Sequence, residues 1–222
     1  REVDLQHSSG RTEHWEPVGL EGLSVVLPPT VYPPREDTAL LDECIASLGA
    51  GEGSRMLELG TGSGVVAIAS ALRGWQVTCC DVNPLAVAAC RGNASQAGVQ
   101  LEVLEGGLDL ECEMDLDSKY DAIVWNLPYL DPPEKGGPRL GPLEDAGLID
   151  LPGESGWGSK LLDALESNPD LLNEGGLVIL LHTNNERGST LQTLWRSEGW
   201  ATRVVGEKRL GGDERLTCFA AW

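Results

Sequence analysis

The sequence predicts an α/β fold: a seven-stranded, mostly parallel, doubly wound sheet of the Rossmann-like type that ends in an antiparallel C-terminal hairpin strand. Helical and strand patterns alternate from residue 36 onward with short connections, which is typical of such sheets. Two strand patterns, at 201–207 and 215–222, flank Gly211-Gly212, and this arrangement favours a hairpin. A chain of 222 residues is expected to form one main domain.

The individual elements follow from the spacing of apolar residues. Leu40, Leu41, Cys44 and Ile45 recur at helical intervals, whereas 122–125 is a continuous apolar run that predicts a buried strand. Helices are expected over 36–48, 65–72, 84–97, 160–172 and 189–197, and strands over 55–59, 75–80, 100–104, 120–125, 177–182, 201–207 and 215–222.

The chain is expected to divide into a short leader and a main domain. Residues 1–30 show little periodicity and close with Pro28-Pro29, which predicts a weakly ordered leader. Residues 31–222 form the predicted main domain. Within it, residues 127–157 are rich in Gly and Pro, and so long a loop inside a domain is usually functional.

Composition and charge exclude several functions. The chain has 16 Lys and Arg against 35 Asp and Glu, a formal net charge of −19. Such a surface repels phosphate backbones and anionic lipids, which disfavours bulk binding to nucleic acid or membranes. The six Cys form no Cys-x-x-Cys pair and the three His are scattered, so no metal site is expected. Without a long apolar run or a signal-peptide pattern, a cytoplasmic protein with reduced thiols is expected.

The strongest local signal is the glycine-rich segment 58–64, which lies between a predicted strand and a predicted helix. Its three glycines allow the backbone to turn tightly and approach a ligand closely. Asp81 ends the next strand, where a carboxylate can bridge two ribose hydroxyls. Glu58 would repel a pyrophosphate but suits a cationic ligand such as S-adenosylmethionine, which carries ammonium and sulfonium groups.

A second signal is the tetrapeptide Asn126-Leu-Pro-Tyr129 at the end of the fourth predicted strand. Ligands of open α/β sheets bind outside the carboxyl ends of the strands, so this turn is expected to face the glycine-rich segment. The Asn side-chain carbonyl and the next backbone carbonyl can both accept hydrogen bonds from one planar –NH2 group. Those bonds would leave the nitrogen lone pair free to attack a methyl donor.

Other polar and aromatic residues have simpler explanations. Glu36 and Asp37 suit the N-terminus of a helix, and helix capping explains them. Trp157, in the long loop, is the one Trp expected near a substrate, and His182 is expected in the core or at its rim. The tryptophans expected in the core are Trp75, Trp125, Trp195 and Trp200.

Together these segments resemble the glutamine N5-methyltransferases of the HemK-like family, and most closely their eukaryotic and archaeal branch. That branch carries Val-Tyr-x-Pro-x-Glu-Asp-Thr, matched at 31–38, and Glu-x-Gly-x-Gly-Ser-Gly-Val-Val, matched at 58–66. Its Asp-x-Asn-Pro corresponds to 81–84 and its Asp-Leu to Asp109-Leu110. The resemblance covers about residues 31–222 and implies the class I methyltransferase version of the fold.

The resemblance also implies roles for the matched residues. Thr38 and Glu58 would hold the amino-acid end of S-adenosylmethionine, and Asp81 would bind its ribose. Asp109 and the backbone of Leu110 would read the adenine. The whole implied cofactor-binding set is Tyr32, Thr38, Glu58, Gly60, Gly62, Gly64, Asp81, Val82, Asp109, Leu110 and Asn126. The implied catalytic set is Asn126, Leu127, Pro128 and Tyr129, in which Asn126 would bind the substrate amide.

The implied substrate is the Gln of the Gly-Gly-Gln motif in a class-1 translation termination factor. The implied partner is a small zinc-binding activator subunit in a heterodimer. Two features depart from the family pattern. The usual Asn-Pro-Pro-Tyr has Leu127 at its second position, which still supplies a backbone carbonyl but with less rigidity, so lower turnover is expected. Residues 132–157 match poorly and are expected to shape substrate choice.

Other functions stay open on the sequence. An adenine-N6 methyltransferase also holds an exocyclic amine with an Asn/Asp-Pro-Pro-Tyr turn, but it must flip a base out of a nucleic acid, which the charge disfavours. Methylation of a Lys or a small molecule would not need the acceptor geometry of Asn126. A non-catalytic cofactor-binding subunit would explain Leu127, although Asn126, Tyr129 and Asp81 are intact.

Overall fold

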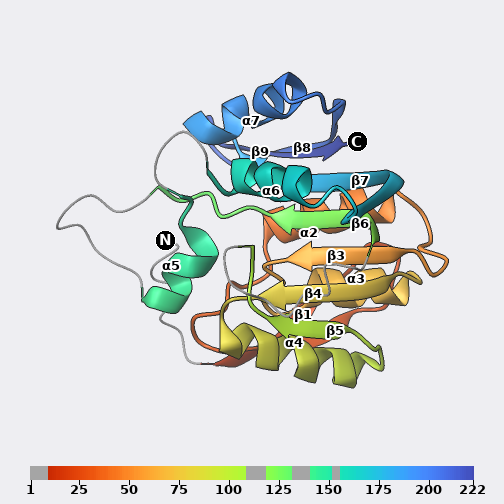
Figure 1. Cartoon of the computed structure of the whole chain (residues 1–222). Helices are drawn as coiled ribbons and strands as arrows, with labels where there is room; N and C mark the ends of the chain where they lie inside the picture. Colours follow the sequence, from red (N-terminus) through yellow and green to blue (C-terminus); the bar gives the residue numbers. More distant parts are fainter. Residues whose placement is uncertain (1–9, 109–118, 132–140, 152–155) are drawn as a thin grey trace.

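A mixed sheet of seven strands organises the computed structural model, which describes residues 10–108, 119–131, 141–151 and 156–222. Its strands are β3 (Arg55–Leu59), β4 (Gln76–Asp81), β5 (Glu102–Glu105), β6 (Tyr120–Asn126), β7 (Leu172–Thr183), β8 (Thr202–Arg209) and β9 (Arg215–Ala221). They lie side by side in the order β5-β4-β3-β6-β7-β9-β8 (Figure 1). The first five are parallel, and β9 runs antiparallel to both β7 and β8. The predicted sheet and its hairpin are therefore confirmed.

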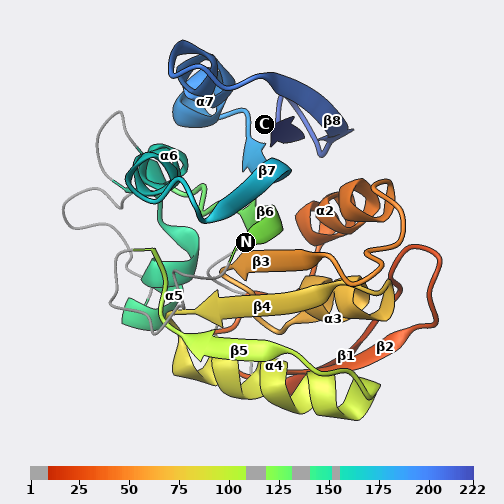
Figure 2. The ribbon, with the colours of Figure 1, turned by 45° about the vertical axis from the view of Figure 1, so that its right-hand side comes forward.

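Helices cover both faces of the sheet. They are α2 (Glu36–Ala46), α3 (Val65–Leu72), α4 (Pro84–Ala97), α5 (Pro142–Leu148), α6 (Gly156–Ser167) and α7 (Glu186–Ser197). In Figure 2, α6 lies to the left of the sheet and α2 to its right. Strand β6 alternates between them: Ala122 and Val124 join the core beneath α2, α3 and α4, whereas Ile123 and Trp125 join the core beneath α6 and α7. This two-residue period explains why β6 reads as a continuous apolar run.

The leader expected over residues 1–30 needs correction for its described part. Strands β1 (Arg11–Trp15) and β2 (Leu23–Leu27) pair as an antiparallel hairpin. Val25 and Leu27 are buried, and the backbone of Val26 exchanges two hydrogen bonds with the side chain of Asn93 on α4. The apolar alternation in β2 spans only five positions, which is too short to predict a strand from sequence. The contacts with α4 hold the hairpin in place.

A buried ion pair fastens the loop of this hairpin to the domain. Arg73 donates to Asp42 on α2 at 2.6 Å and to the carbonyl of Val18, while the Val18 N–H donates to the other Asp42 oxygen. Both charged side chains are buried, at 9% and 2% exposure. Removing one partner would leave the other charge without compensation.

Arg73→Met is therefore expected to lower the free energy of unfolding by about 3–5 kcal/mol, because it leaves the buried Asp42 carboxylate without a positively charged partner. The measurement is a denaturant titration followed by tryptophan fluorescence. The matched control is Lys119→Met, which breaks the exposed Lys119–Asp170 pair and should leave the midpoint unchanged. Equal midpoints for both variants would contradict a structural role for the Arg73 network.

The remaining differences from the predicted elements lie around the long loop. Helix α5 was expected to be part of that loop. It begins with Pro142 at its first turn, where the missing N–H costs nothing, and its end is held by hydrogen bonds between Leu130 and the 148–150 backbone. Helix α6 spans Gly156–Ser167, about four residues earlier than the predicted range of 160–172. Strand β7 begins at Leu172 instead of the predicted residue 177, because Leu172 pairs with Tyr120 on β6.

Candidate functional site

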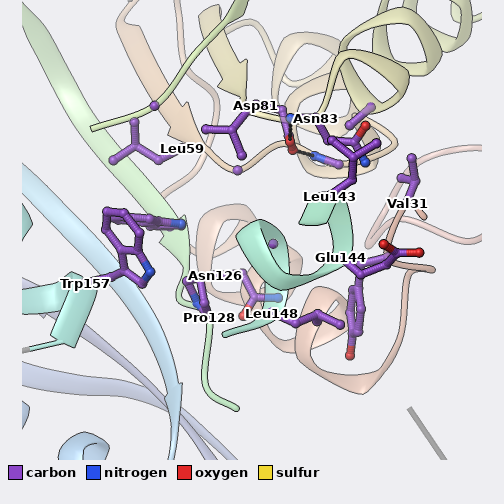
Figure 3. A pocket seen from close by; sticks show the side chains of 18 of the residues that line it. Val31, Leu59, Asp81, Asn83, Asn126, Pro128, Leu143, Glu144, Leu148 and Trp157 are labelled. Carbon is purple, nitrogen blue, oxygen red and sulfur yellow. Dashed lines mark hydrogen bonds between the residues drawn. The ribbon is translucent and has the colours of Figure 1, made fainter. Parts of the chain in front are cut away.

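A cavity of about 300 Å³ opens beyond the carboxyl ends of the parallel strands, and residues of α5 form part of its lining (Figure 3). The side chains of Asp81 and Asn126 lie on opposite sides of the cavity in Figure 3, and Trp157 stands at its edge. Seven of the predicted site residues line it: Tyr32, Gly60, Gly62, Asp81, Val82, Asn126 and Pro128. The structure thus brings together the two motifs that were expected to face each other.

The glycine-rich turn forms one wall of the cavity. Gly60, Gly62 and Gly64 have φ angles of 65°, 56° and 85°, a region that favours glycine. A Cβ atom on Gly60 would lie 3.2 Å from Nε1 of Trp125, whereas one on Gly62 would meet nothing within 4 Å. The backbone at Gly62 therefore borders open space. Gly64 does not line the cavity and packs instead against Cys90, whose Sγ would be 2.6 Å from an added Cβ.

Asp81 is the acidic group that faces the cavity. One of its oxygens accepts from the N–H of Gly62 at 2.8 Å and the other from the N–H of Asn83 at 2.9 Å. These bonds fix the carboxylate beside the glycine-rich turn. Burial raises the pKa of Asp81, and its two backbone donors oppose that rise. Val82 lines the cavity next to it.

Glu58 lies behind the turn and does not line the cavity in this structure. It is 4% exposed and accepts a hydrogen bond from Thr61 Oγ1 at 2.7 Å. Burial raises the pKa of Glu58 to about 8, the Thr61 bond lowers it, and the nearby Asp81 carboxylate adds to the rise. Because this pKa lies near neutral pH, a cation bound beside the Glu58 carboxyl group would favour its ionised form.

The Asn126–Tyr129 turn forms the opposite wall. Asn126 Nδ2 donates to Asp37 Oδ2 at 3.0 Å, while Asn126 Oδ1 is buried without a hydrogen-bond partner in the described part of the protein. A buried acceptor without a partner costs free energy unless a ligand supplies the donor. The amide oxygen is therefore suited to accept from a bound –NH2 group.

Neighbouring residues hold this turn in place. The Leu127 side chain is buried in the core beneath α6 and α7, and its N–H donates to the carbonyl of Leu181 on β7. The Tyr129 hydroxyl is 3.1 Å from that of Tyr32, and Asn185 Nδ2 donates to the Tyr129 carbonyl at 2.9 Å. Leu127 and Tyr129 do not line the cavity themselves.

Thr38 lies in the first turn of α2 and does not line the cavity. Its Oγ1 accepts from the N–H of Arg35 and its N–H donates to Asp37, so both groups serve the start of the helix. Asp109 and Leu110, predicted to read an adenine, lie outside the described residues. The adenine end of the implied site stays a prediction.

Sequence reasoning missed several residues that line the cavity, among them Trp125 and residues of helix α5. Trp125, expected in the core, lines the cavity while its ring also packs on Trp157 at 5.8 Å between centroids. Trp157 lines the cavity too, as a residue near substrate should, and Asp150 holds its backbone N–H. Helix α5 contributes Leu143, Glu144 and Leu148. Their signal was absent because α5 is too short to show helical periodicity.

No group of three or more His, Cys, Asp or Glu side chains among the described residues is arranged to hold a metal ion. None of the described helices combines the length and the apolar character that crossing a membrane requires.

Several known proteins are similar to this chain in sequence. Residues 36–135 match the Methyltransferase small domain family. A release factor glutamine methyltransferase of Deinococcus radiodurans is 30% identical over 216 residues, which cover 96% of this chain and 73% of that protein. A candidate protein N5-glutamine methyltransferase of Methanocaldococcus jannaschii is also 30% identical, over 75% of this chain and 79% of its own length.

A solved structure shares the fold. The Mtq2–Trm112 complex of E. cuniculi, responsible for methylation of the eRF1 translation termination factor, superimposes with a TM-score of 0.57 and 22% identity. The match covers 86% of this chain and 98% of that one.

Proposed function

Since the chain belongs to the family of release factor glutamine methyltransferases, we propose that it methylates the N5 nitrogen of the Gln in the Gly-Gly-Gln motif of a class-1 translation termination factor. The chain is an S-adenosylmethionine-dependent methyltransferase with the Rossmann-like fold of class I enzymes. The observation that carries the substrate proposal is the Asn126 amide oxygen, which is buried at the cavity wall and has no hydrogen-bond partner among the residues that the structure describes.

The residues around the cavity fit the cofactor. Gly62 leaves its backbone open to the cavity, and Asp81 presents a fixed carboxylate to a ribose. Glu58 lies directly behind the glycine-rich turn, outside the cavity lining, and in this proposal it pairs with the cofactor ammonium group. When bound, S-adenosylmethionine supplies an electrophilic methyl group on a sulfonium. Residue roles within the cofactor site are part of the proposal.

The contribution of the protein is orientation and electrostatics. An amide nitrogen is a poor nucleophile because its lone pair is delocalised into the carbonyl. Two acceptors, Asn126 Oδ1 and the Leu127 carbonyl, would bind the two N–H groups of the substrate amide. Those bonds would increase electron density on the nitrogen and hold its lone pair toward the donor methyl group. The N–C bond would then form in line as the C–S bond of the donor breaks, and one amide proton would be released to water, without a covalent enzyme intermediate.

A partner subunit is also proposed. The E. cuniculi structure that shares this fold was solved together with Trm112. A small zinc-binding activator would play the same part here and form a heterodimer with this chain. Edge strands of the sheet are the usual places for such contacts.

The test is methyl transfer from labelled S-adenosylmethionine to a release factor, with and without a candidate activator subunit. A release factor with the motif Gln replaced by Ala is the matched control. Label in the Gln-containing factor alone is the expected result, and its dependence on the second subunit tests the partner. Label in an adenine-containing oligonucleotide but not in the release factor would overturn the substrate proposal.

A further inference from the structure

We propose that Asp37 is a positioning residue that fixes the orientation of the Asn126 amide, so that the site selects a carboxamide over a carboxylate of the same shape. This inference rests on the proposed function, because it concerns how the same site recognises glutamine. Asp37 lies in the first turn of α2 and is 3% exposed. It reaches the turn at the end of β6 across 89 positions of sequence.

The two oxygens of Asp37 have separate partners. Oδ1 accepts from the N–H of Thr38 at 2.7 Å and from its hydroxyl at 3.2 Å. Oδ2 accepts from Asn126 Nδ2 at 3.0 Å. Only the first set of bonds serves the helix terminus. Helix capping therefore accounts for Oδ1 of Asp37, whereas Oδ2 binds the Asn126 side chain in the turn after β6.

A carboxylate has acceptors but no donor, whereas the two ends of an Asn amide differ. Because Oδ2 of Asp37 can only accept, Asn126 must turn its –NH2 end toward α2. The opposite end, Oδ1, is then the one that has no partner within the described parts of the chain. Rotating the amide by half a turn would set two oxygens against each other at hydrogen-bond distance and leave the –NH2 group without this acceptor.

This orientation has a consequence for substrate choice. A glutamine amide offers donors to Asn126 Oδ1, while a glutamate carboxylate of nearly the same shape would place oxygen against oxygen. A site that is built to accept from a buried –NH2 rejects analogues that lack the donor, because its own acceptor then stays unpaired. Asp37 thereby decides which of the two side chains fits, without contacting either one.

The decisive variant is Asp37→Asn, which keeps the size of the side chain and an oxygen for the N–H of Thr38. Its new –NH2 group would face Asn126 and favour the rotated amide, which presents donors to the substrate. The matched control is Glu36→Gln, which removes the neighbouring charge of the same helix turn but not the bond to Asn126.

The readouts separate positioning from a general structural role. For Asp37→Asn we expect kcat toward the Gln-containing release factor to fall by about 10- to 100-fold, with the Kd for S-adenosylmethionine within about twofold of the parent. Inhibition by a release factor whose motif Gln is replaced by Glu should strengthen by about tenfold or more. Glu36→Gln should change none of these values. A loss of kcat without tighter inhibition by the Glu factor would overturn the inference.

A spectroscopic arm decides the inference independently of turnover. In the parent protein the Asn126 side-chain –NH2 signals should show slow hydrogen exchange and should shift in Asp37→Asn but not in Glu36→Gln. Unchanged Asn126 signals in Asp37→Asn would overturn the role of Asp37. Absence of label transfer by the parent enzyme, with the expected signals present, would instead count against the proposed function alone.

Discussion

Replacing Asn126 with Ala is expected to reduce methyl transfer by about 10²–10³-fold while S-adenosylmethionine binds nearly as before. The loss is of the size seen when one preorganised hydrogen-bonding group is removed from an active site. The reason is that Asn126 Oδ1 is a buried acceptor without a hydrogen-bond partner among the described residues, and in the proposed function it binds the substrate –NH2. The measurements are initial rates with labelled donor and a calorimetric titration with the cofactor.

The matched control is Asn173→Ala. Asn173 also donates from Nδ2 to a carboxylate, that of Asp121, but it lies near the start of β7, away from the cavity. Its replacement should leave the rate unchanged. Equal losses of rate and of cofactor affinity in Asn126→Ala would assign the residue to cofactor binding and remove the argument for amide recognition.

The affinity for S-adenosylmethionine is expected to weaken as the pH falls below about 8. Burial raises the pKa of Glu58 to about 8, so the free protein holds this acid largely protonated at pH 7. Pairing with the cofactor ammonium group requires the carboxylate, and its proton must then be released. Affinity should drop by up to about tenfold for each pH unit below the pKa. The raised pKa of Asp81 acts in the same direction.

Calorimetry in two buffers of different ionisation enthalpy would measure the released protons directly. Glu58→Gln should abolish most of the release and flatten the pH dependence below 8. A pH-independent affinity in the parent protein would show that Glu58 does not meet the ammonium group. The stability of the fold depends on pH in the opposite direction to the cofactor affinity. The contribution of neutral Glu58 to the free energy of unfolding is complete below its ordinary pKa of 4.5 and is lost as the pH rises through about 8.

The sheet and the main motifs could be predicted because their signals are local. The burial of strand β6 is visible as one apolar run, and the glycine-rich turn has glycine at each of its three positive-φ positions, 60, 62 and 64. The parallel arrangement of the strands then determines where these motifs lie, since the carboxyl ends of parallel strands must meet at one edge of the sheet. This rule alone predicts that Asp81 and Asn126 face one cavity, and both residues line it.

What could not be predicted depends on contacts between distant segments. Asp37 looks like an ordinary capping residue until α2 is packed against β6 and its second oxygen meets Asn126. The Tyr32–Tyr129 contact joins positions 97 residues apart and has no local pattern. Helix α5 is stabilised by its bridge to Leu130 rather than by its own seven residues, and such short helices are marginal in isolation.

The hydrogen bonds of Asn93 carry a practical consequence for producing this protein. Residues 93–95 spell Asn-Ala-Ser, an acceptor sequence for N-linked glycans. In the folded protein the Asn93 amide is 2% exposed and bonds both to the β1–β2 hairpin and to the carbonyl of Ser63 in the glycine-rich turn. A sugar attached there during synthesis would prevent those contacts from forming. Secretion from a eukaryotic host would therefore yield misfolded chains, whereas expression in a bacterial cytosol avoids the modification.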